Sequence, residues 1–395
     1  MNEQEVMSLY DISSIRPRAR VLYDYALQDK LSFFQVNENN IEKASNLVLE
    51  VTQKNYPNLK IPYHSRWRHF EVVKNGLYKD VLSIIEQYDK KEAVKRKVEL
   101  VILSALLDAG AGNSWQYNYK GTVYTRSEGL AVATLNAYLQ GKLSAVNDPC
   151  GIGGKALVEL TESSFCAAFQ ANENNPLIGV SNRVALMHAI GGELLETNHD
   201  SLFIAIFSDV DLESDSISIK QLFHDLLMFL VPLLPEATKI NNIAVGDVGQ
   251  HDLLKDDDNP LGLIPFHKLI QWICYSLIEP FTDAGITVTD TDFLTGLPEY
   301  RNGGLFSDLN VISVKDESLL KQKWSLSSSF VVEWRALTVV LLDTIRNEIS
   351  KELDLEISMG MLLQGGSWEA GRGLAKKLRA NAQGPYLMES HGTIF

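Results

Sequence analysis

The stretch best equipped for chemistry is residues 297–309, which read LPEYRNGGLFSDL. It places a carboxylate, Glu299, two residues before Arg301 and just ahead of a glycine pair. Glycine tolerates backbone conformations that other residues avoid, so we expect a tight turn that a ligand can approach closely. In an extended or turn segment, Glu299 and Arg301 would point the same way and share one ligand or one ion pair. A buried structural ion pair at a loop explains the same residues equally well.

Segment 61–72, IPYHSRWRHFEV, combines hydrogen-bond donors with flat apolar rings, which is unusual in so acidic a chain. Arg66 and His69 supply polar groups that can bind a substrate, and Trp67 supplies a ring that can stack on a planar group. Trp67 and Phe70 are equally well explained as core residues, with the arginines in solvent. A binding and a structural interpretation therefore both remain open.

The run VELVILSALLDA predicts a helix over residues 91–107 that is buried on nearly all sides. The helix ends at Asp108, in a glycine-rich turn that also carries Asn113 and Trp115. A buried aspartate needs a partner. Asp108 is therefore either bonded to the turn as a helix-terminal residue or part of a site.

Two predicted helix starts carry further polar candidates. Ser127 and Glu128 lie in the first turn of one helix, and His267 and Lys268 lie at the start of another. The first N–H groups of a helix have no partner inside it, so a helix N-terminus suits a phosphate.

A long helix predicted after the serine cluster SSSF carries Glu333 and Arg335 in its apolar part. Charged side chains in so hydrophobic a stretch need partners. We therefore expect these two residues to form an ion pair that holds the substrate-binding residues in position without contacting the substrate.

Apolar residues at helical spacing dominate the chain and strand signals are few, so the sequence predicts a mainly α fold. We expect one large domain over residues 1–395, with 1–200 and 201–395 as candidate lobes. The acidic segment 247–259 is predicted to be an exposed loop, and the C-terminal end to contain a glycine-rich turn and a short basic helix. Further helices are predicted over residues 11–28, 41–56, 155–171, 181–195 and 219–234.

The composition is that of a globular protein, with 45% hydrophobic and 22% charged residues. A net charge of -14 argues against a broad nucleic-acid interface. Cys150, Cys166 and Cys274 are far apart and lack CxxC spacing, which favours a reducing cytosol over a disulfide framework or a zinc site. The N-terminus lacks the features of a signal peptide, and the longest apolar run, 226–235, is too short for a membrane span. We therefore expect a cytoplasmic protein that binds neither membranes nor nucleic acid.

Several long strings resemble those of the uracil-catabolism family known as the fourth protein of the URC pathway. They are IPYHSRWRHFEV, LLDAGAGNSWQY, RSEGLAVAT, PFHKLIQW, LPEYRNGGLFSD, VEWRAL and the end HGTIF, and they cover nearly the whole chain. That family is distantly similar to the queuosine-5′-phosphate N-glycosidases. The resemblance implies a two-lobed helical fold akin to that of helix-hairpin-helix DNA glycosylases.

The resemblance also implies an activity. The URC pathway converts uracil to UMP, opens the pyrimidine ring and leaves a urea group on ribose. We expect this chain to hydrolyse the resulting ribosylurea bond. The products would be urea and ribose, or ribose 5-phosphate if the substrate is phosphorylated.

Residue roles follow from the same resemblance. In the queuosine relative, an Asp-Tyr-Arg triplet carries the catalytic carboxylate, and PEYR offers Glu299, Tyr300 and Arg301 in the same order with a longer acid. The lysine-containing helix before that triplet resembles HKLIQW and implies Lys268 as a sugar or phosphate ligand. The Glu-x-Arg segment after it resembles VEWR.

Cleavage of an N-glycoside passes through an oxocarbenium-like transition state, which a carboxylate stabilises. Glu299 would supply that carboxylate and Arg301 would keep it charged, while either Asp108 or His69 would protonate the departing urea. The remaining candidates would bind the substrate: Arg66, Trp67, Asn113, Trp115, Ser127, Glu128, His267, Lys268 and Tyr300.

Three other functions fit parts of the sequence. His69 and the pair His199-Asp200 suit a metal-dependent phosphohydrolase of the helical His-Asp class, although His64 and His69 are five residues apart and do not share a helix face. A DNA glycosylase fits the expected fold but not the charge. A regulatory, nucleotide-binding protein without turnover would share the pocket. We expect a small ribosyl substrate and no metal or cofactor, and the sequence leaves the oligomeric state open.

Overall fold

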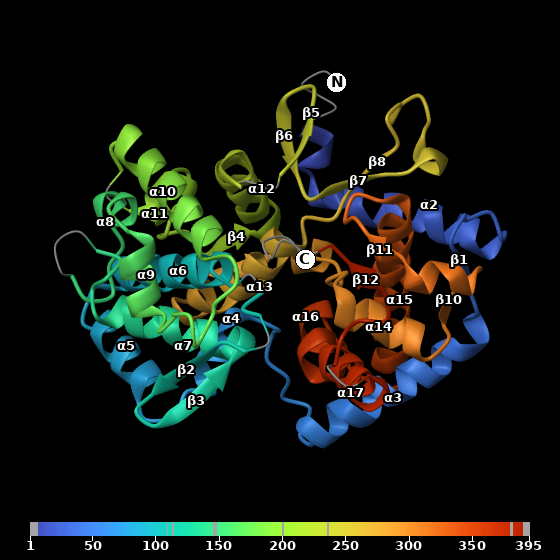
Figure 1. Cartoon of the computed structure of the whole chain (residues 1–395), viewed down its shortest axis with the longest axis horizontal. Coiled ribbons are helices and arrows are strands. Elements are labelled where there is room, and N and C mark those ends of the chain that lie inside the picture. Colours follow the sequence, from blue (N-terminus) through green and yellow to red (C-terminus); the bar gives the residue numbers. More distant parts are fainter. Residues whose placement is uncertain are drawn as a thin grey trace.

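The computed structural model describes residues 7–108, 110–112, 114–144, 148–199, 201–234, 237–379 and 382–389. The fold is mainly α, as the sequence predicts, and the described strands occur only in two-stranded pairs. The helices form two lobes that lie side by side (Figure 1).

The first lobe, cyan to green in Figure 1, contains the middle of the chain and is built around α6 (Lys90–Leu106). Asp89 caps α6, and every residue from Val98 to Leu106 is buried, because other helices cover α6 on several sides. The other elements of this lobe are α4 (Arg66–Glu71), α5 (Leu77–Ile85), β2 (Gln116–Tyr119), β3 (Thr122–Thr125), α7 (Arg126–Leu139), α8 (Gly154–Val158), α9 (Glu162–Ala168), α10 (Val180–Glu196), α11 (Leu202–Ile206), β4 (Ser216–Ser218), α12 (Ile219–Leu230), α13 (Lys268–Asp283) and β9 (Thr287–Thr289).

The second lobe is built around α15 (Ser329–Leu353), a 25-residue helix that Ser328 caps. Its apolar residues are buried because α15 packs against four other helices, α2, α3, α14 and α16. The other elements are α2 (Ile15–Leu27), β1 (Phe34–Val36), α3 (Ile41–Asn55), β5 (Thr238–Ile240), β6 (Ile243–Gly246), β7 (Val248–Gln250), β8 (Leu263–Pro265), α14 (Tyr300–Asp308), β10 (Ile312–Val314), β11 (Lys323–Trp324), α16 (Met359–Leu362), α17 (Trp368–Leu378) and β12 (Leu387–Met388).

The lobes do not follow the division at residue 200. The N-terminal helices α2 and α3 pack against α15, and β1 pairs with β10 in an antiparallel register. Arg16 of α2 binds the carboxylate of Asp343 in α15, with 2.7 Å between its Nε and Oδ2. Both ends of the chain therefore contribute to the second lobe (Figure 1).

Two glycine pairs expected in turns lie inside helices. Gly303 belongs to α14, where a Cβ atom would lie 2.6 Å from the indole of Trp334, so the missing side chain makes room for that ring. Gly366 belongs to a π-helical segment, Leu363–Ser367, that packs closely on α3. The absence of a side chain thus serves helix packing at both pairs, and the expected turns are wrong.

The helix predicted over 155–171 is also interrupted. It forms α8 and α9, because Thr161 starts a new helix with a capping box that includes Ser164. The helices predicted over 11–28, 41–56, 181–195 and 219–234 are confirmed as α2, α3, α10 and α12, with ends that differ by up to four residues.

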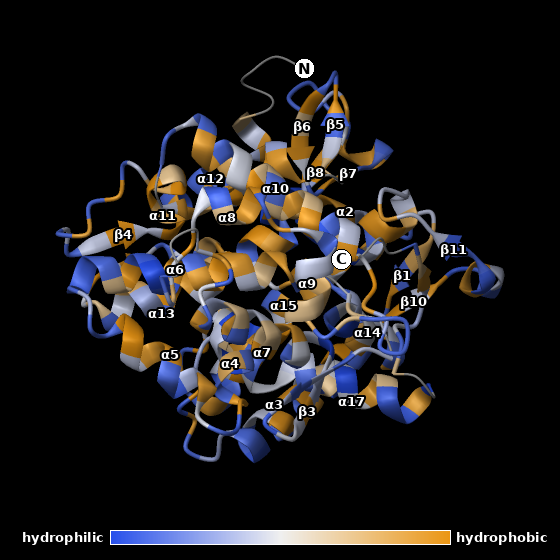
Figure 2. Cartoon of the chain, turned by 60° about the vertical axis from the view of Figure 1, so that its left-hand side comes forward, coloured by the Kyte–Doolittle hydropathy of each residue, from blue (hydrophilic) through white to orange (hydrophobic). Residues whose placement is uncertain are grey.

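Hydrophilic and hydrophobic residues alternate along outer helices such as α3 and α17 (Figure 2), as expected of helices with one face in the core. Cys150, Cys166 and Cys274 are free thiols. None of the helices in the described ranges combines the length and apolarity needed to cross a bilayer.

Candidate functional site

Glu299 is the N-cap of α14. Its carboxylate accepts hydrogen bonds from the backbone N–H groups of Arg301 at 3.0 Å and Asn302 at 2.8 Å, and its side chain is buried. These bonds hold the carboxylate in one orientation at the positive end of the helix. Among the described residues Glu299 has no ion pair with Arg301, whose guanidinium lies over the ring of Trp368 instead. The expected ion pair between these two side chains is therefore wrong, and a ligand shared by them stays a prediction.

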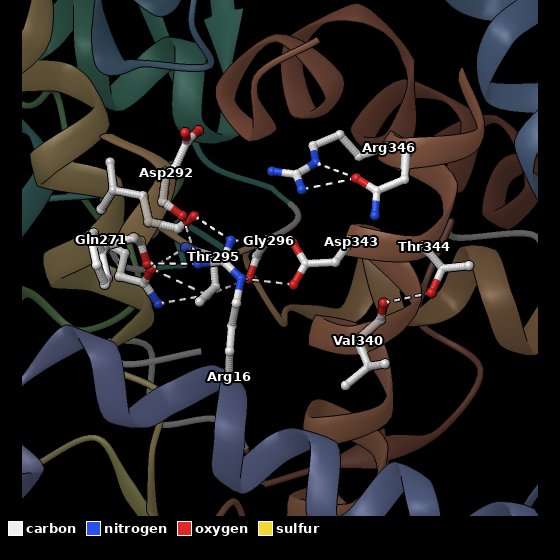
Figure 3. Close-up of polar contacts among 12 residues, drawn as sticks. Arg16, Gln271, Asp292, Thr295, Gly296, Val340, Asp343, Thr344 and Arg346 are labelled. Carbon is white, nitrogen blue, oxygen red and sulfur yellow. Dashed lines mark hydrogen bonds and ion pairs between the residues drawn. The ribbon is translucent and has the colours of Figure 1, made fainter. Parts of the chain in front are cut away.

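Side chains from three helices hold the loop that leads into Glu299. Arg16 donates hydrogen bonds to the carbonyl oxygens of residues 292–294 while its other edge binds Asp343 (Figure 3). Gln271 accepts a hydrogen bond from the backbone N–H of Thr295 at 2.7 Å. The start of α14 is thus tied to α2, α13 and α15, which fixes the position of the carboxylate.

Lys268 is the first residue of α13, and its backbone N–H donates to the carboxylate of Asp247 at 3.0 Å. The residue before it, His267, has a φ of 44°, in the left-handed region that non-glycine residues adopt only at a cost of about 1 kcal/mol or more. Burial lowers the pKa of the Lys268 ammonium, and the charges of Glu299 and Asp108 oppose that shift. The ammonium therefore lies within electrostatic reach of both carboxylates.

Asp108 follows α6 and faces Arg66 of α4, with 3.1 Å between its Oδ2 and Nη1 of the arginine. Burial raises the pKa of the Asp108 carboxyl, against the charges of Arg66 and Lys268 and a bond from the Ser127 hydroxyl. Its Oδ1 is buried and has no hydrogen-bond partner among the residues that the structure describes. A buried polar atom of this kind is rare in proteins, and a substrate group would satisfy it.

Two buried histidines, His64 and His69, lie among these cations. Burial lowers the pKa of His64 to about 4, and burial together with the charge of Arg66 lowers that of His69 well below its ordinary value. Both imidazoles are therefore neutral at pH 7. Nη1 of Arg66 is 3.4 Å from Nδ1 of His69, and arginine can only donate, so the proton of His69 is on Nε2.

Arg301 and Arg372 lie on the same aromatic ring. The guanidinium carbon of Arg301 is 4.1 Å from the centroid of Trp368, and that of Arg372 is 5.4 Å from it. Nη1 of Arg372 is also 3.7 Å from the carboxylate of Glu128 in α7. Tyr300 contacts Arg301 with its ring at 5.0 Å. These contacts join α17 and α14 of one lobe to α7 of the other.

The expected pair of Glu333 with Arg335 is wrong, because each has a different partner. Glu333 accepts hydrogen bonds from the backbone N–H groups of residues 32–34 at 2.9 to 3.2 Å, and from Nε2 of His251. Arg335 binds both carboxylate oxygens of Asp247 at 2.6 Å. Asp247 therefore does not belong to an exposed loop, contrary to the prediction for segment 247–259.

The structure does not bring every candidate to this group. The indole N–H groups of Trp67 and Trp115 donate to backbone carbonyl groups in the packed interior. The ring of His267 turns toward the N-terminal segment, with Nε2 2.9 Å from the carbonyl oxygen of Leu9. Asn113 lies outside the described residues.

Sequence reasoning missed Trp368, Arg372 and Asp247. Trp368 and Arg372 are four residues apart, so they share a helix face, and that spacing was the available signal. Asp247 offered no such signal, because its partner is 88 residues away.

Side chains of the types that bind metal ions do not cluster in the part of the chain that the structure describes. Within the described ranges, no cluster of three or more His, Cys, Asp or Glu side chains is arranged to hold a metal ion. His199 is described, whereas Asp200 is not.

Comparisons with known proteins place the chain in a family. A family model described as "Protein of unknown function (DUF1688)" matches residues 8–395. "Protein urg3" of Schizosaccharomyces pombe is 36% identical over 406 residues, which cover 100% of both chains. "Uracil catabolism protein 4" of Lachancea kluyveri is 32% identical over 430 residues, which cover 97% of each. The chain therefore belongs to the DUF1688 family, and the resemblance of its motifs to the uracil-catabolism family is confirmed.

Proposed function

We propose that this chain is an N-glycoside hydrolase of uracil catabolism that cleaves ribosylurea, or its 5′-phosphate, to urea and ribose, or ribose 5-phosphate. The name of the Lachancea kluyveri relative supports the pathway. The observation that carries the reaction is a pair of carboxyl groups: Glu299, fixed by two N-cap bonds at the start of α14, and Asp108, whose buried Oδ1 has no partner among the described residues. Two carboxyl groups in different environments are the usual means of breaking a glycosidic bond.

The environments assign different roles to the two groups. Glu299 stabilises the positive charge that develops on C1′ of the ribose, and it either adds to C1′ or orients the attacking water. The bond between C1′ and the urea nitrogen breaks, and the electron pair leaves with urea. Asp108 protonates that nitrogen, and water supplies the hydroxyl group on C1′ and returns one proton, so the reaction consumes one water.

Asp108 is a better proton donor than His69, which the sequence left as the alternative. Burial raises the pKa of Asp108, which favours the protonated carboxyl, whereas His69 is a neutral imidazole with an arginine against its Nδ1. The free Oδ1 of Asp108 can carry the proton to the leaving group. Lys268 helps to orient the substrate between the two carboxyl groups.

The two-lobed helical arrangement also supports the proposal that the fold resembles that of helix-hairpin-helix DNA glycosylases. Binding sites for small molecules often lie where two domains or lobes meet. The group around Glu299 and Asp108 draws residues from both lobes (Figure 1), which is consistent with that placement.

The reaction is tested by urea release. Purified protein is given ribosylurea or its 5′-phosphate, each with and without a metal chelator, and urea is measured by a coupled assay. We expect chelator-resistant release from at least one compound. Release that the chelator abolishes would favour the metal-dependent alternative. If neither compound releases urea, a binding or regulatory role without turnover is favoured, since the N-cap bonds of Glu299 also give that residue a structural role.

The raised pKa of Asp108 predicts how kcat/KM changes on the alkaline side of its pH profile. Because its pKa is raised above the usual 3.8 and the acid must be protonated to act, kcat/KM should fall as the pH rises through the raised pKa. Asp108→Asn should lower kcat by about 10²-fold or more and remove this limb of the profile. If the limb persists in the residual activity of the variant, another group is the acid.

A further inference from the structure

The cations of the site exceed its carboxylates, although the whole chain carries a net charge of -14. Burial raises the pKa of the Tyr300 hydroxyl, and the charges of Arg301, Arg126 and Arg372 oppose that shift, so all three guanidinium groups lie near this ring. Arg66, Arg301 and Arg372 likewise act on His69. Positive charge from α4, α7, α14 and α17 thus converges on one place.

Acidic groups neutralise only part of this charge. Asp108 pairs with Arg66, and Glu128 pairs with Arg372 at 3.7 Å, while Glu299 lies near Lys268. The five cations named here therefore exceed these carboxylates by two, and by three when Asp108 is protonated as the acid of the proposed reaction. The cations are Arg66, Arg126, Lys268, Arg301 and Arg372.

Two of these arginines are held side by side. Gly371 packs directly on the carbonyl oxygen of Arg301, in a space where no side chain fits, and this close approach of α17 to α14 sets Arg372 beside Arg301. Both guanidinium groups lie over the ring of Trp368. Contact with this ring limits the rotation of the two arginine side chains, so their remaining hydrogen-bond donors are preorganised.

One donor of this pair lacks a partner. Nε of Arg372 is buried and makes no hydrogen bond to any residue that the structure describes. Leaving a charged donor buried and unsatisfied costs free energy that a bound anion would recover. The carboxylate of Glu128, at 3.7 Å from Nη1, does not occupy this donor.

We propose that Arg301 and Arg372 form a site for the 5′-phosphate of the substrate, so that the phosphorylated ribosylurea is the form that the protein hydrolyses. This inference rests on the proposed function for the identity of the sugar, but not for the binding of phosphate. A phosphate monoester carries about 1.5 to 2 negative charges at pH 7, and the surplus of positive charge favours its binding. Two guanidinium groups can bind its oxygens in bidentate fashion, as a single ammonium cannot.

The position of the site fits the chemistry. Arg301 follows Glu299 by two residues on the same helix start, and Arg372 is linked to α7, whose Ser127 contacts Asp108. A phosphate held by the arginines would therefore anchor a ribose whose C1′ faces the two carboxyl groups. Binding energy from the non-reacting phosphate would be used to position C1′.

The test measures binding without turnover. Calorimetric titrations with ribose 5-phosphate, ribose and inorganic phosphate are made on the wild type, Arg301→Gln, Arg372→Gln and a control, Arg346→Gln. Arg346 lies on α15 and hydrogen-bonds to its neighbour Asn347 (Figure 3), away from the stacked pair. Arg372→Lys keeps the positive charge but not the bidentate donor geometry, so it separates the loss of phosphate contacts from a loss of charge. Thermal unfolding of each unliganded variant shows whether the variant is folded.

We expect the wild type to bind ribose 5-phosphate about 100-fold more tightly than ribose. Each glutamine variant should lose about tenfold or more of that affinity, Arg372→Lys should lose part of it, and Arg346→Gln should lose none. Equal affinity for ribose and ribose 5-phosphate, or full affinity in both glutamine variants, would overturn the site. Inorganic phosphate binding as tightly as ribose 5-phosphate would mean an adventitious anion site and would also overturn it.

The two proposals fail in different ways. A protein that binds ribose 5-phosphate through the arginines but releases no urea keeps the phosphate site and loses the hydrolase. A protein that releases urea from ribosylurea and from its 5′-phosphate with equal kcat/KM keeps the hydrolase and loses the phosphate site.

Discussion

Glu299→Gln is expected to lower kcat for urea release on the order of 10³-fold or more while ribose 5-phosphate still binds. Glutamine keeps the size of the side chain and an oxygen that can accept one of the two N-cap bonds, but it cannot stabilise a cation on C1′. The loss of charge should therefore act on the transition state and not on the ground state. Single-turnover urea release and calorimetric binding separate the two effects.

The matched control for this experiment is Asp89→Asn. Asp89 is also an N-cap carboxylate, and it accepts a hydrogen bond from the N–H of Glu92 at 3.0 Å, at the start of α6. Both substitutions remove a negative charge from the positive end of a helix, so each should cost roughly 0.3 to 1 kcal/mol of stability. Only Glu299→Gln should lose turnover. An active Glu299→Gln enzyme, or an Asp89→Asn enzyme that is equally impaired, would remove Glu299 from its catalytic role.

Local patterns in the sequence identify most helices and the segments that carry the site. The start of α13 at Lys268 follows from apolar residues at helical spacing. The buried helix before Asp108 follows from a continuous apolar run that is too long for a strand. The conformation around Glu299 does not follow in the same way. A glycine pair favours a turn in isolation, but here Gly303 allows Trp334 to pack against α14, and that contact comes from 31 residues away.

The partners of the buried charged residues could not be predicted from the sequence either, for a related reason. Glu333 is two residues from Arg335, which places the two side chains on different faces of a helix, so each finds a partner from another element. For Glu333 these partners are backbone N–H groups about 300 residues earlier, and for Arg335 the partner is Asp247. A pattern within one segment contains no information about such contacts.

Some members of the candidate site could be named from the sequence, and their roles stay predictions. The sequence marks Glu299, Lys268, Asp108 and Arg66, and the structure brings them together from three helix ends and a short helix. It does not mark Arg372, because a basic residue in a helix that carries several others is usually on a solvated face. The packing of Gly371 on α14 and the contacts with Trp368 and Glu128 give that arginine its position, and of these only the spacing from Trp368 can be read in the sequence.

The largest loss of stability is expected for Arg335→Met. The guanidinium binds both oxygens of Asp247 at 2.6 Å, and both side chains are largely buried, at 4% and 12% exposure. Removing the arginine leaves an uncompensated carboxylate, which typically costs 3 to 5 kcal/mol, about what a buried pair loses with one partner. Guanidinium denaturation measures the change in the free energy of unfolding. Arg20→Met, which breaks an exposed pair with Asp24, is the control and should cost less than about 1 kcal/mol.

Loss of the ion pair between Arg335 and Asp247 should also lower activity, because both residues bind segments of the site. Asp247 also accepts the backbone N–H of Lys268, and Nε of Arg335 donates to the carbonyl oxygen of Pro298, next to Glu299. Although burial raises the pKa of Asp247, Arg335 lowers it below its ordinary value overall, so the pair contributes its stability above the unfolded-state pKa and loses it as the pH falls through the folded one. Arg335→Met should therefore flatten the acid limb of the stability profile and lower kcat even where the protein is folded. Asp247→Leu in the same chain should restore much of the stability but not the activity, because no group then holds Lys268 and Pro298 in place. Restored activity in that double variant would show that the ion pair stabilises the fold without positioning the site.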